Sequence, residues 1–178
     1  GRPKQEDRHV KIPDLTKAAK ALKMPIDHLD QPCALYSVFD GHQGHLCAEF
    51  AAKNFHMHLL KKLSAEKRGD LWTDERIKDT LREVCEALDA EFLAKFRTAP
   101  DGSTLVVALV TGTRAFTAWL GDSRAVMCRE SSGGEIITVA LTEDHRPGHP
   151  AEAERVKKAG GEIVNLDGCA RVAHAGFD

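Results

Sequence analysis

The stretch Ala34-Leu-Tyr-Ser-Val-Phe-Asp-Gly-His-Gln-Gly44 carries the strongest signal in the sequence. Its apolar first half is typical of a buried strand, which stops abruptly at a carboxylate, a glycine and a histidine. Asp40 at a strand end can hold a hard divalent cation, and the carbonyl of Gly41 can approach the same ion because glycine has no Cβ. His42 can carry a proton near neutral pH. The stretch therefore predicts metal-assisted chemistry with a titratable side chain beside the metal.

Size and composition limit the class of protein. A length of 178 residues suits one domain with a sizeable core, and 42% hydrophobic with 29% charged residues is a globular balance. The net charge of −2 argues against a dedicated nucleic-acid binder, and no apolar run approaches the ~20 residues of a membrane helix. The five cysteines include no Cys-x-x-Cys pair, which favours thiols in a reducing compartment over a zinc site. We therefore expect a cytoplasmic or nuclear protein.

Apolar periodicity predicts a strand, then a pair of helices, then a strand meander. The predicted helices cover Leu15–Leu22, Gly44–Leu63, Asp74–Phe96 with Thr73 as its cap, and Pro150–Ala159. The predicted strands cover His9–Ile12, Ala34–Phe39, Leu105–Val110, Arg114–Leu120, Ala125–Arg129 and Glu135–Leu141, with a hairpin turn at Ser131–Gly134. Short connections between the later strands favour antiparallel pairing, and the order lacks regular βαβ alternation.

Three other segments could add polar side chains to the end of the Ala34–Phe39 strand. Glu6 and Asp7 would lie near Asp40 if the first strand pairs beside it. Neighbouring antiparallel strands could bring Thr104 and Asp122 to one edge. Taken singly, each segment is more typical of a solvated terminus or a β-turn.

Taken together, these segments resemble the metal-dependent protein serine/threonine phosphatases of type 2C. The matching elements follow the order of that family and extend over essentially the whole chain. They are Arg2-Pro-Lys-Gln-Glu-Asp7, Val38-Phe-Asp-Gly-His-Gln-Gly44, Gly102-Ser-Thr104, Gly121-Asp-Ser-Arg124, and Thr142-Glu-Asp-His-Arg-Pro147 with Glu154-Arg155 and Ala159-Gly-Gly161.

The resemblance implies an α+β fold, a four-layer α-β-β-α sandwich of two mainly antiparallel sheets flanked by helices. It also implies hydrolysis of phosphoserine and phosphothreonine in protein substrates by a water that bridges two Mn²⁺ or Mg²⁺ ions. The remaining partner expectations are no nucleic acid, no membrane span and a monomer when complete. An unrelated α/β interaction domain, and a pseudophosphatase with the same fold but no turnover, are the alternatives.

Site roles follow from the same resemblance. Asp40 would bridge the two metals, the Gly41 carbonyl would bind one, and Glu6 would reach a metal mainly through water. Asp7 would support the same set of metal ligands. Asp122, with Thr104 nearby as a supporting residue, would serve a third, weaker metal site and help orient His42. Arg2 would hold the substrate phosphate and His42 would be the general acid.

Two departures from the family pattern carry expectations of their own. Gln43 replaces a glycine, which is tolerable if its φ is negative. The later Asp-Gly-x-x-Asp and Asp-Asn elements of the family do not occur before Asp178. We therefore expect residues 1–178 to form an incomplete catalytic domain that is inactive alone, with the family's flap starting near residues 165–178 and poor order near Val164–Asp178.

Overall fold

The computed structural model describes residues 4–166 and 168–173. The chain divides into two compact units, Gly1–Trp119 and Leu120–Asp178. Each unit has secondary structure and contacts of its own, and the candidate site draws chiefly on the first.

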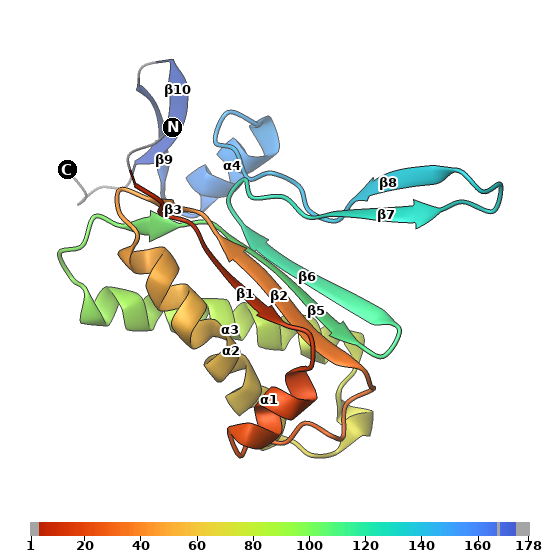
Figure 1. Ribbon diagram of the computed structural model, residues 1–178. Coiled ribbons are helices and arrows are strands. Elements are labelled where there is room, and N and C mark those ends of the chain that lie inside the picture. The colour runs from red at the N-terminus through yellow and green to blue at the C-terminus, as the bar shows by residue number, and fades with distance from the viewer. Residues whose placement is uncertain (1–3, 167, 174–178) are drawn as a thin grey trace. The chain divides into compact units, whose positions relative to one another are not determined.

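The first unit is built on a four-stranded antiparallel sheet in the order β1-β2-β5-β6 (Figure 1). The strands are β1 (Arg8–Ile12), β2 (Cys33–Phe39), β5 (Leu105–Thr111) and β6 (Arg114–Leu120). In β1 and β2, Arg8 lies opposite Phe39. In β2 and β5, Val38 lies opposite Val106. The sequence analysis expected Glu6 and Asp7 to lie near Asp40 if the first strand pairs with the second. The structure has this pairing of β1 with β2.

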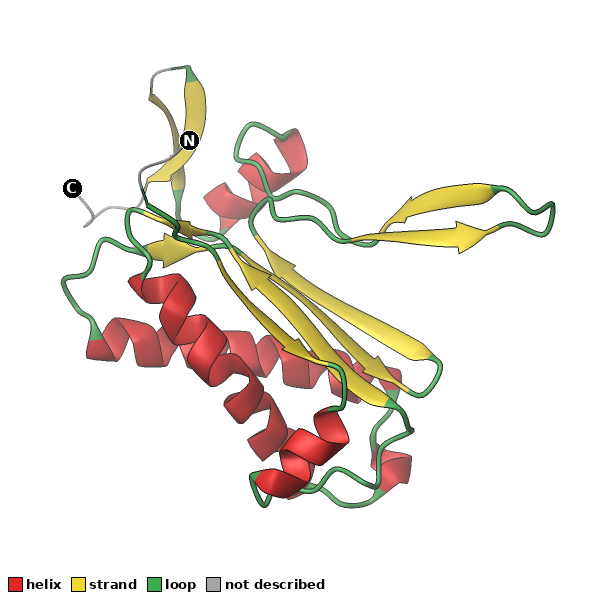
Figure 2. Cartoon of the chain, viewed as in Figure 1, coloured by secondary structure: helices red, strands yellow, loops and turns green. Residues whose placement is uncertain are grey.

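Helices cover one face of this sheet (Figure 2). They are α1 (Leu15–Ala21), α2 (Leu46–Ala65) and α3 (Asp74–Lys95), with a short 3-10 helix at Gly69–Leu71. In β2, Leu35 and Phe39 are fully buried, whereas Tyr36 and Val38 on the other face are exposed. The alternation follows from the two-residue period of a strand, which sends successive side chains to opposite faces.

The predicted apolar stripe of the third helix accounts for its packing. The buried positions step by three or four residues along α3, as an amphipathic helix requires: Ile77, Leu81, Val84, Leu88 and Phe92. The helix begins where predicted, because the Oγ1 of Thr73 accepts a hydrogen bond of 3.3 Å from the backbone N–H of Arg76. This stripe joins the residues of α2 in a single core with the inner face of the sheet.

The second unit contains two hairpins and a helix. One hairpin pairs β7 (Val126–Glu130) with β8 (Ile136–Ala140), and the other pairs β9 (Glu162–Leu166) with β10 (Cys169–Ala173). The helix α4 (Pro150–Lys158) starts with a proline, as predicted. The expectations of poor order near Val164–Asp178 and of a flap that starts near residues 165–178 stay predictions. In this part of the chain, β9 and β10 pair with each other. Residues 174–178 lie outside the described part.

The α+β fold class is confirmed, since four α-helices and antiparallel sheets make up the described residues. Element ends differ from the predictions by one or two residues. Four of the described strands were not predicted. β3 (Gly41–His42) and β4 (Gly102–Ser103) pair with each other at the candidate site, and β9 and β10 form the second hairpin of the second unit. Within the described ranges, no helix has both the length and the apolar character needed to cross a membrane.

Candidate active site

The end of β2 lies against the segment that precedes β1. A Cβ added to Gly41 would lie 2.7 Å from the carbonyl oxygen of Glu6 and 3.2 Å from its Cβ. Only a residue without a side chain allows so close an approach of the two backbones. Glu6 and the Asp40–Gly41 turn are therefore neighbours, although they come from separate parts of the chain.

Thr104 fixes the backbone of Asp40 from the other side. Its Oγ1 accepts a hydrogen bond of 3.2 Å from the N–H of Asp40, and its own N–H donates one of 2.9 Å to the Asp40 carbonyl. The hydroxyl of Ser103 lies 3.4 Å from the same carbonyl oxygen. The predicted supporting residue Thr104 thus contacts the predicted metal ligand Asp40, and it holds the main chain of that residue.

His42 lies against the backbone of the Asp101–Thr104 segment. It is paired with Gly102 in the β3–β4 ladder. A Cβ on residue 102 would overlap the Nε2 of the imidazole, so the ring occupies the space that a side chain would need. The side chain of His42 is otherwise exposed.

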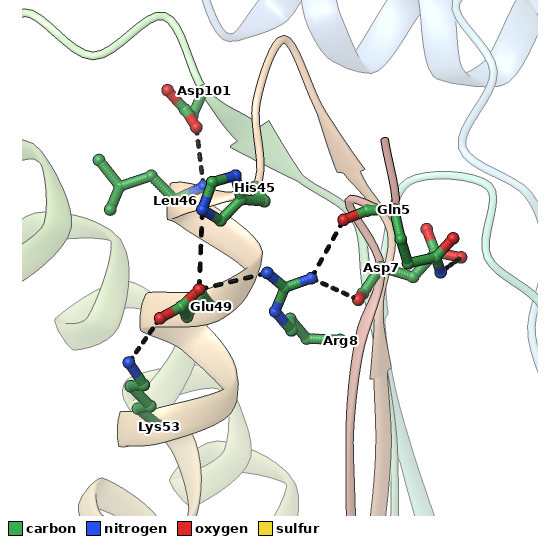
Figure 3. A network of polar contacts seen from close by, with 8 residues as sticks. All are labelled: Gln5, Asp7, Arg8, His45, Leu46, Glu49, Lys53 and Asp101. Atoms are coloured by element: carbon green, nitrogen blue, oxygen red, sulfur yellow. Dashed lines mark hydrogen bonds and ion pairs between the residues drawn. The ribbon is translucent and has the colours of Figure 1, made fainter. Parts of the chain in front are cut away.

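The helix that follows this loop is capped by a residue that the sequence analysis did not select. His45 occupies the N-cap position of α2 but makes no capping hydrogen bond through its side chain. The Oδ1 of Asp101 instead accepts a hydrogen bond of 2.8 Å from the N–H of Leu46 (Figure 3). The preference for aspartate at helix N-termini is the only sequence signal that could have identified Asp101. That signal was hidden because Asp101 and Leu46 are 55 residues apart in the sequence.

The condition under which a side chain at residue 43 was expected to be tolerable is not met. The φ of Gln43 is +57° rather than negative. This is the left-handed region, in which a Cβ is crowded by the backbone and glycine is favoured. The chain therefore turns at residue 43 in a way that suits the glycine of the family pattern, and the glutamine adopts that conformation under strain.

A network of ionic contacts links the first strand to the first turns of α2 (Figure 3). The guanidinium of Arg8 lies 3.2 Å from Glu49, and it donates hydrogen bonds to the backbone carbonyls of Asp7 at 2.8 Å and Gln5 at 3.3 Å. The Asp7 side chain accepts a hydrogen bond of 3.0 Å from Gln5. Hydrogen bonds hold the pKa of Glu49 below its usual value, and the bond from Lys53 contributes more than the bond from Arg8. Sequence analysis missed Arg8, which secures the backbone that carries Glu6.

Asp122 belongs to the second unit, where its partner is an arginine. Its carboxylate lies 3.7 Å from Arg146 and is half exposed. Asp144 beside it is nearly buried, and it receives two hydrogen bonds from Arg124, of 3.0 and 2.9 Å, and an ion pair of 3.1 Å from Arg146. The closeness of Asp122 to Thr104 and His42 stays a prediction, and Arg2 lies outside the described residues.

Comparisons with known proteins show the family to which the chain belongs. The family model for protein phosphatase 2C matches residues 1–175. The chain belongs to the protein phosphatase 2C family. The human and mouse integrin-linked kinase-associated serine/threonine phosphatases 2C are each 32% identical to it over 168 residues. Protein phosphatase 2C 56 of Arabidopsis thaliana is 33% identical over 174 residues.

Two solved structures have the same fold. A sex-determining protein of C. elegans superimposes with a TM-score of 0.72 at 31% identity, and it is matched by 96% of this chain. A serine-threonine phosphatase 2C of Toxoplasma gondii superimposes with a TM-score of 0.69 at 25% identity, and 94% of this chain matches it. The chain covers 41% of the human relative, 38% of the Arabidopsis relative, and 38% and 54% of these two structures.

The metal ions expected of a phosphatase 2C can be compared with the oxygen donors at the site. Carboxylates and carbonyls are the ligands that Mg²⁺ and Mn²⁺ prefer, and Asp40, Glu6 and the Gly41 carbonyl are of this kind. Among residues 4–166 and 168–173, however, no three acidic, histidine or cysteine side chains gather closely enough to hold an ion. The donors therefore fit part of a metal site.

Proposed function

We propose that this chain is the N-terminal part of the catalytic domain of a metal-dependent protein serine/threonine phosphatase. The observation that carries the proposal is the meeting of three distant segments at one sheet end. Glu6 lies against Gly41, Thr104 holds Asp40, and Gly102 supports the ring of His42. Membership of the protein phosphatase 2C family supports the same conclusion. The substrates would be phosphoserine and phosphothreonine in proteins.

Each residue has a role that suits its chemistry. Asp40, Glu6 and the Gly41 carbonyl would hold two Mn²⁺ or Mg²⁺ ions, and Asp122 would serve a third, weaker site. When bound, these ions would screen the phosphate charge and lower the pKa of the attacking water. Asp7 would support the ligand shell through its contact with Gln5. Arg2 would bind the phosphate through its planar guanidinium.

His42 would complete the reaction by transferring a proton. Water forms the new P–O bond as the bond to the serine or threonine oxygen breaks, and the leaving oxygen is strongly basic. An exposed imidazolium at the site can give it a proton, which leaves His42 neutral. No covalent bond to the protein is needed, which agrees with the hydrolysis of a phosphate monoester by positioning and charge stabilisation.

The proposal can be tested with Asp40→Asn in the full-length protein. The variant should lose Mn²⁺-dependent hydrolysis of a phosphothreonine peptide, while Asp27→Asn, an exposed change on another loop, should retain it. Full turnover in Asp40→Asn would refute the metal role. A wild-type protein that binds phosphopeptide without turnover would favour the alternative, a pseudophosphatase that acts as a binding module.

The 178-residue chain should be tested beside the full-length protein. Asp40 and Glu6 supply few carboxylates for two ions that each take about six ligands. We therefore expect little or no turnover from the isolated chain at saturating Mn²⁺. Comparable rates for the two proteins would mean that this chain already holds a complete site. A monomer located in the cytoplasm or nucleus is part of the same proposal.

A further inference from the structure

We infer that Asp101 is a positioning residue of the proposed phosphatase reaction, acting on His42 through the loop 41–45. The inference rests on the proposed function. It starts from the hydrogen bond between the Oδ1 of Asp101 and the N–H of Leu46, 2.8 Å long. This bond satisfies one of the free N–H groups in the first turn of the 20-residue helix α2 and places a negative charge at its positive end.

The loop before the helix is shaped around this carboxylate. A Cβ on Gly44 would overlap the Oδ1 of Asp101, and the φ of Gly44 is +141°, a conformation that side chains disfavour. The positive φ therefore favours glycine, and a side chain at residue 44 would displace the Asp101 carboxylate. Gly44 thus lies directly against the Asp101 carboxylate, just before the loop enters α2 at Leu46.

Three residues of the segment Asp101–Thr104 contact the region from Asp40 to Leu46. Thr104 holds the backbone of Asp40, Gly102 supports the ring of His42, and Asp101 fixes the start of α2. Loss of the Asp101 carboxylate would release the loop behind His42 and leave the Thr104 contacts to Asp40 intact. Catalysis should therefore suffer through the position of His42, while metal binding at Asp40 is retained.

The sharpest control is the cap of another helix. The Oδ1 of Asp14 accepts a hydrogen bond from the N–H of Lys17 that is also 2.8 Å long, and it caps α1, which lies away from the motif. Asp14→Ala and Asp101→Ala each remove one capping carboxylate, so they should lower the melting temperature to a similar extent. Only Asp101→Ala should also displace His42 at the proposed active site.

The experiment measures turnover of the full-length variants. Asp101→Ala should lower kcat for a phosphothreonine peptide by roughly 10- to 100-fold, with KM and the Mn²⁺ concentration for half-maximal rate unchanged. The loss should be smaller for an aryl phosphate, whose leaving group needs less of the His42 proton. Asp101→Asn keeps an oxygen acceptor and should restore most of the rate. If Asp101→Ala does not fold, Asp101→Ser provides a weaker cap for the same comparison.

Two readouts separate this inference from the proposed function. Equal kcat for Asp101→Ala and Asp14→Ala, or an equal loss with both substrates, would overturn the positioning role. If the wild-type protein shows no turnover, the proposed function fails, and NMR signals of the His42 ring then test the inference alone. Those signals should shift in Asp101→Ala and not in Asp14→Ala. Unchanged His42 signals in both variants would refute it.

Discussion

Two hydrogen bonds join Thr104 to the backbone of Asp40, although 64 residues separate them in the sequence. The N–H of Asp40 donates to the Thr104 hydroxyl at 3.2 Å, and the N–H of Thr104 donates to the Asp40 carbonyl at 2.9 Å. The first bond depends on the side chain and can be removed by mutation, while the second is independent of it.

Thr104→Val should weaken metal binding as well as folding. The substitution keeps the shape of the side chain and leaves the N–H of Asp40 without its acceptor, at a cost of about 1 kcal/mol in the free energy of unfolding. We expect the Mn²⁺ requirement of the full-length enzyme to rise several-fold, and Thr104→Ser to stay near wild type. Thr111→Val is the control. It removes the 2.8 Å bond to the Asp30 carbonyl at the other end of β5 and should cost stability alone. Equal Mn²⁺ requirements in both valine variants would contradict the prediction.

Gln43→Gly should stabilise the protein. Gln43 adopts a φ of +57°, where a glycine is free of steric cost, and relief of that strain should exceed the extra chain entropy by about 1 kcal/mol. Chemical denaturation of the two proteins measures the gain. Lys23→Gly is a matched control, because Lys23 also has a φ of +57° but lies just beyond α1. A gain at residue 23 and a loss at residue 43 would mean that the Gln43 side chain makes a favourable contact of its own.

His42→Gln should slow hydrolysis in proportion to the basicity of the leaving group. Glutamine can fill the space over Gly102 but cannot donate a proton as an acid does. The rate should fall strongly for a phosphothreonine peptide and little for an aryl phosphate, while the exposed His9 on β1 can be changed to glutamine without effect. An equal loss for both substrates, together with weaker Mn²⁺ binding, would instead assign His42 as a metal ligand.

Asp144 should make stability depend on pH at the acidic end. A hydrogen bond from the Arg124 guanidinium, the largest cause, holds the pKa of Asp144 below its usual value of 3.8. The ionised Asp144 carboxylate therefore stabilises the fold fully above pH 3.8. This stabilisation is lost as the pH falls through the lowered pKa of Asp144 in the folded protein. Asp144→Asn should lower the melting temperature at pH 6 and differ less from wild type at pH 3. Asp79→Asn, which breaks an exposed pair with Arg82, should change little at either pH. A constant difference for Asp144→Asn would exclude this linkage.

Sequence predicted best the features whose cause is local. The stripe from Ile77 to Phe92 and the cap at Thr73 lie within one helix, so the spacing of residues determines them. The approach of Glu6 to Gly41 was predicted only on condition that β1 pairs with β2, because pairing depends on partners distant in sequence. The same limit hid Asp101, whose hydrogen bond reaches Leu46 across 55 residues. For Gln43, the resemblance to the family motif showed an unusual residue, but the sign of its φ depends on the turn between β3 and α2.

The pairing of β2 with β5 has a consequence for the order of events during synthesis. Asp40 and His42 leave the ribosome well before Thr104, and both long helices are made in the interval. Contacts between distant segments form slowly because a long loop must close first. We expect the hydrophobic faces of α2 and α3 to associate early, while the nascent strand β2 waits with an unpaired edge. The site is thus assembled among the last parts of its unit, and until then this edge is open to wrong partners or to a chaperone.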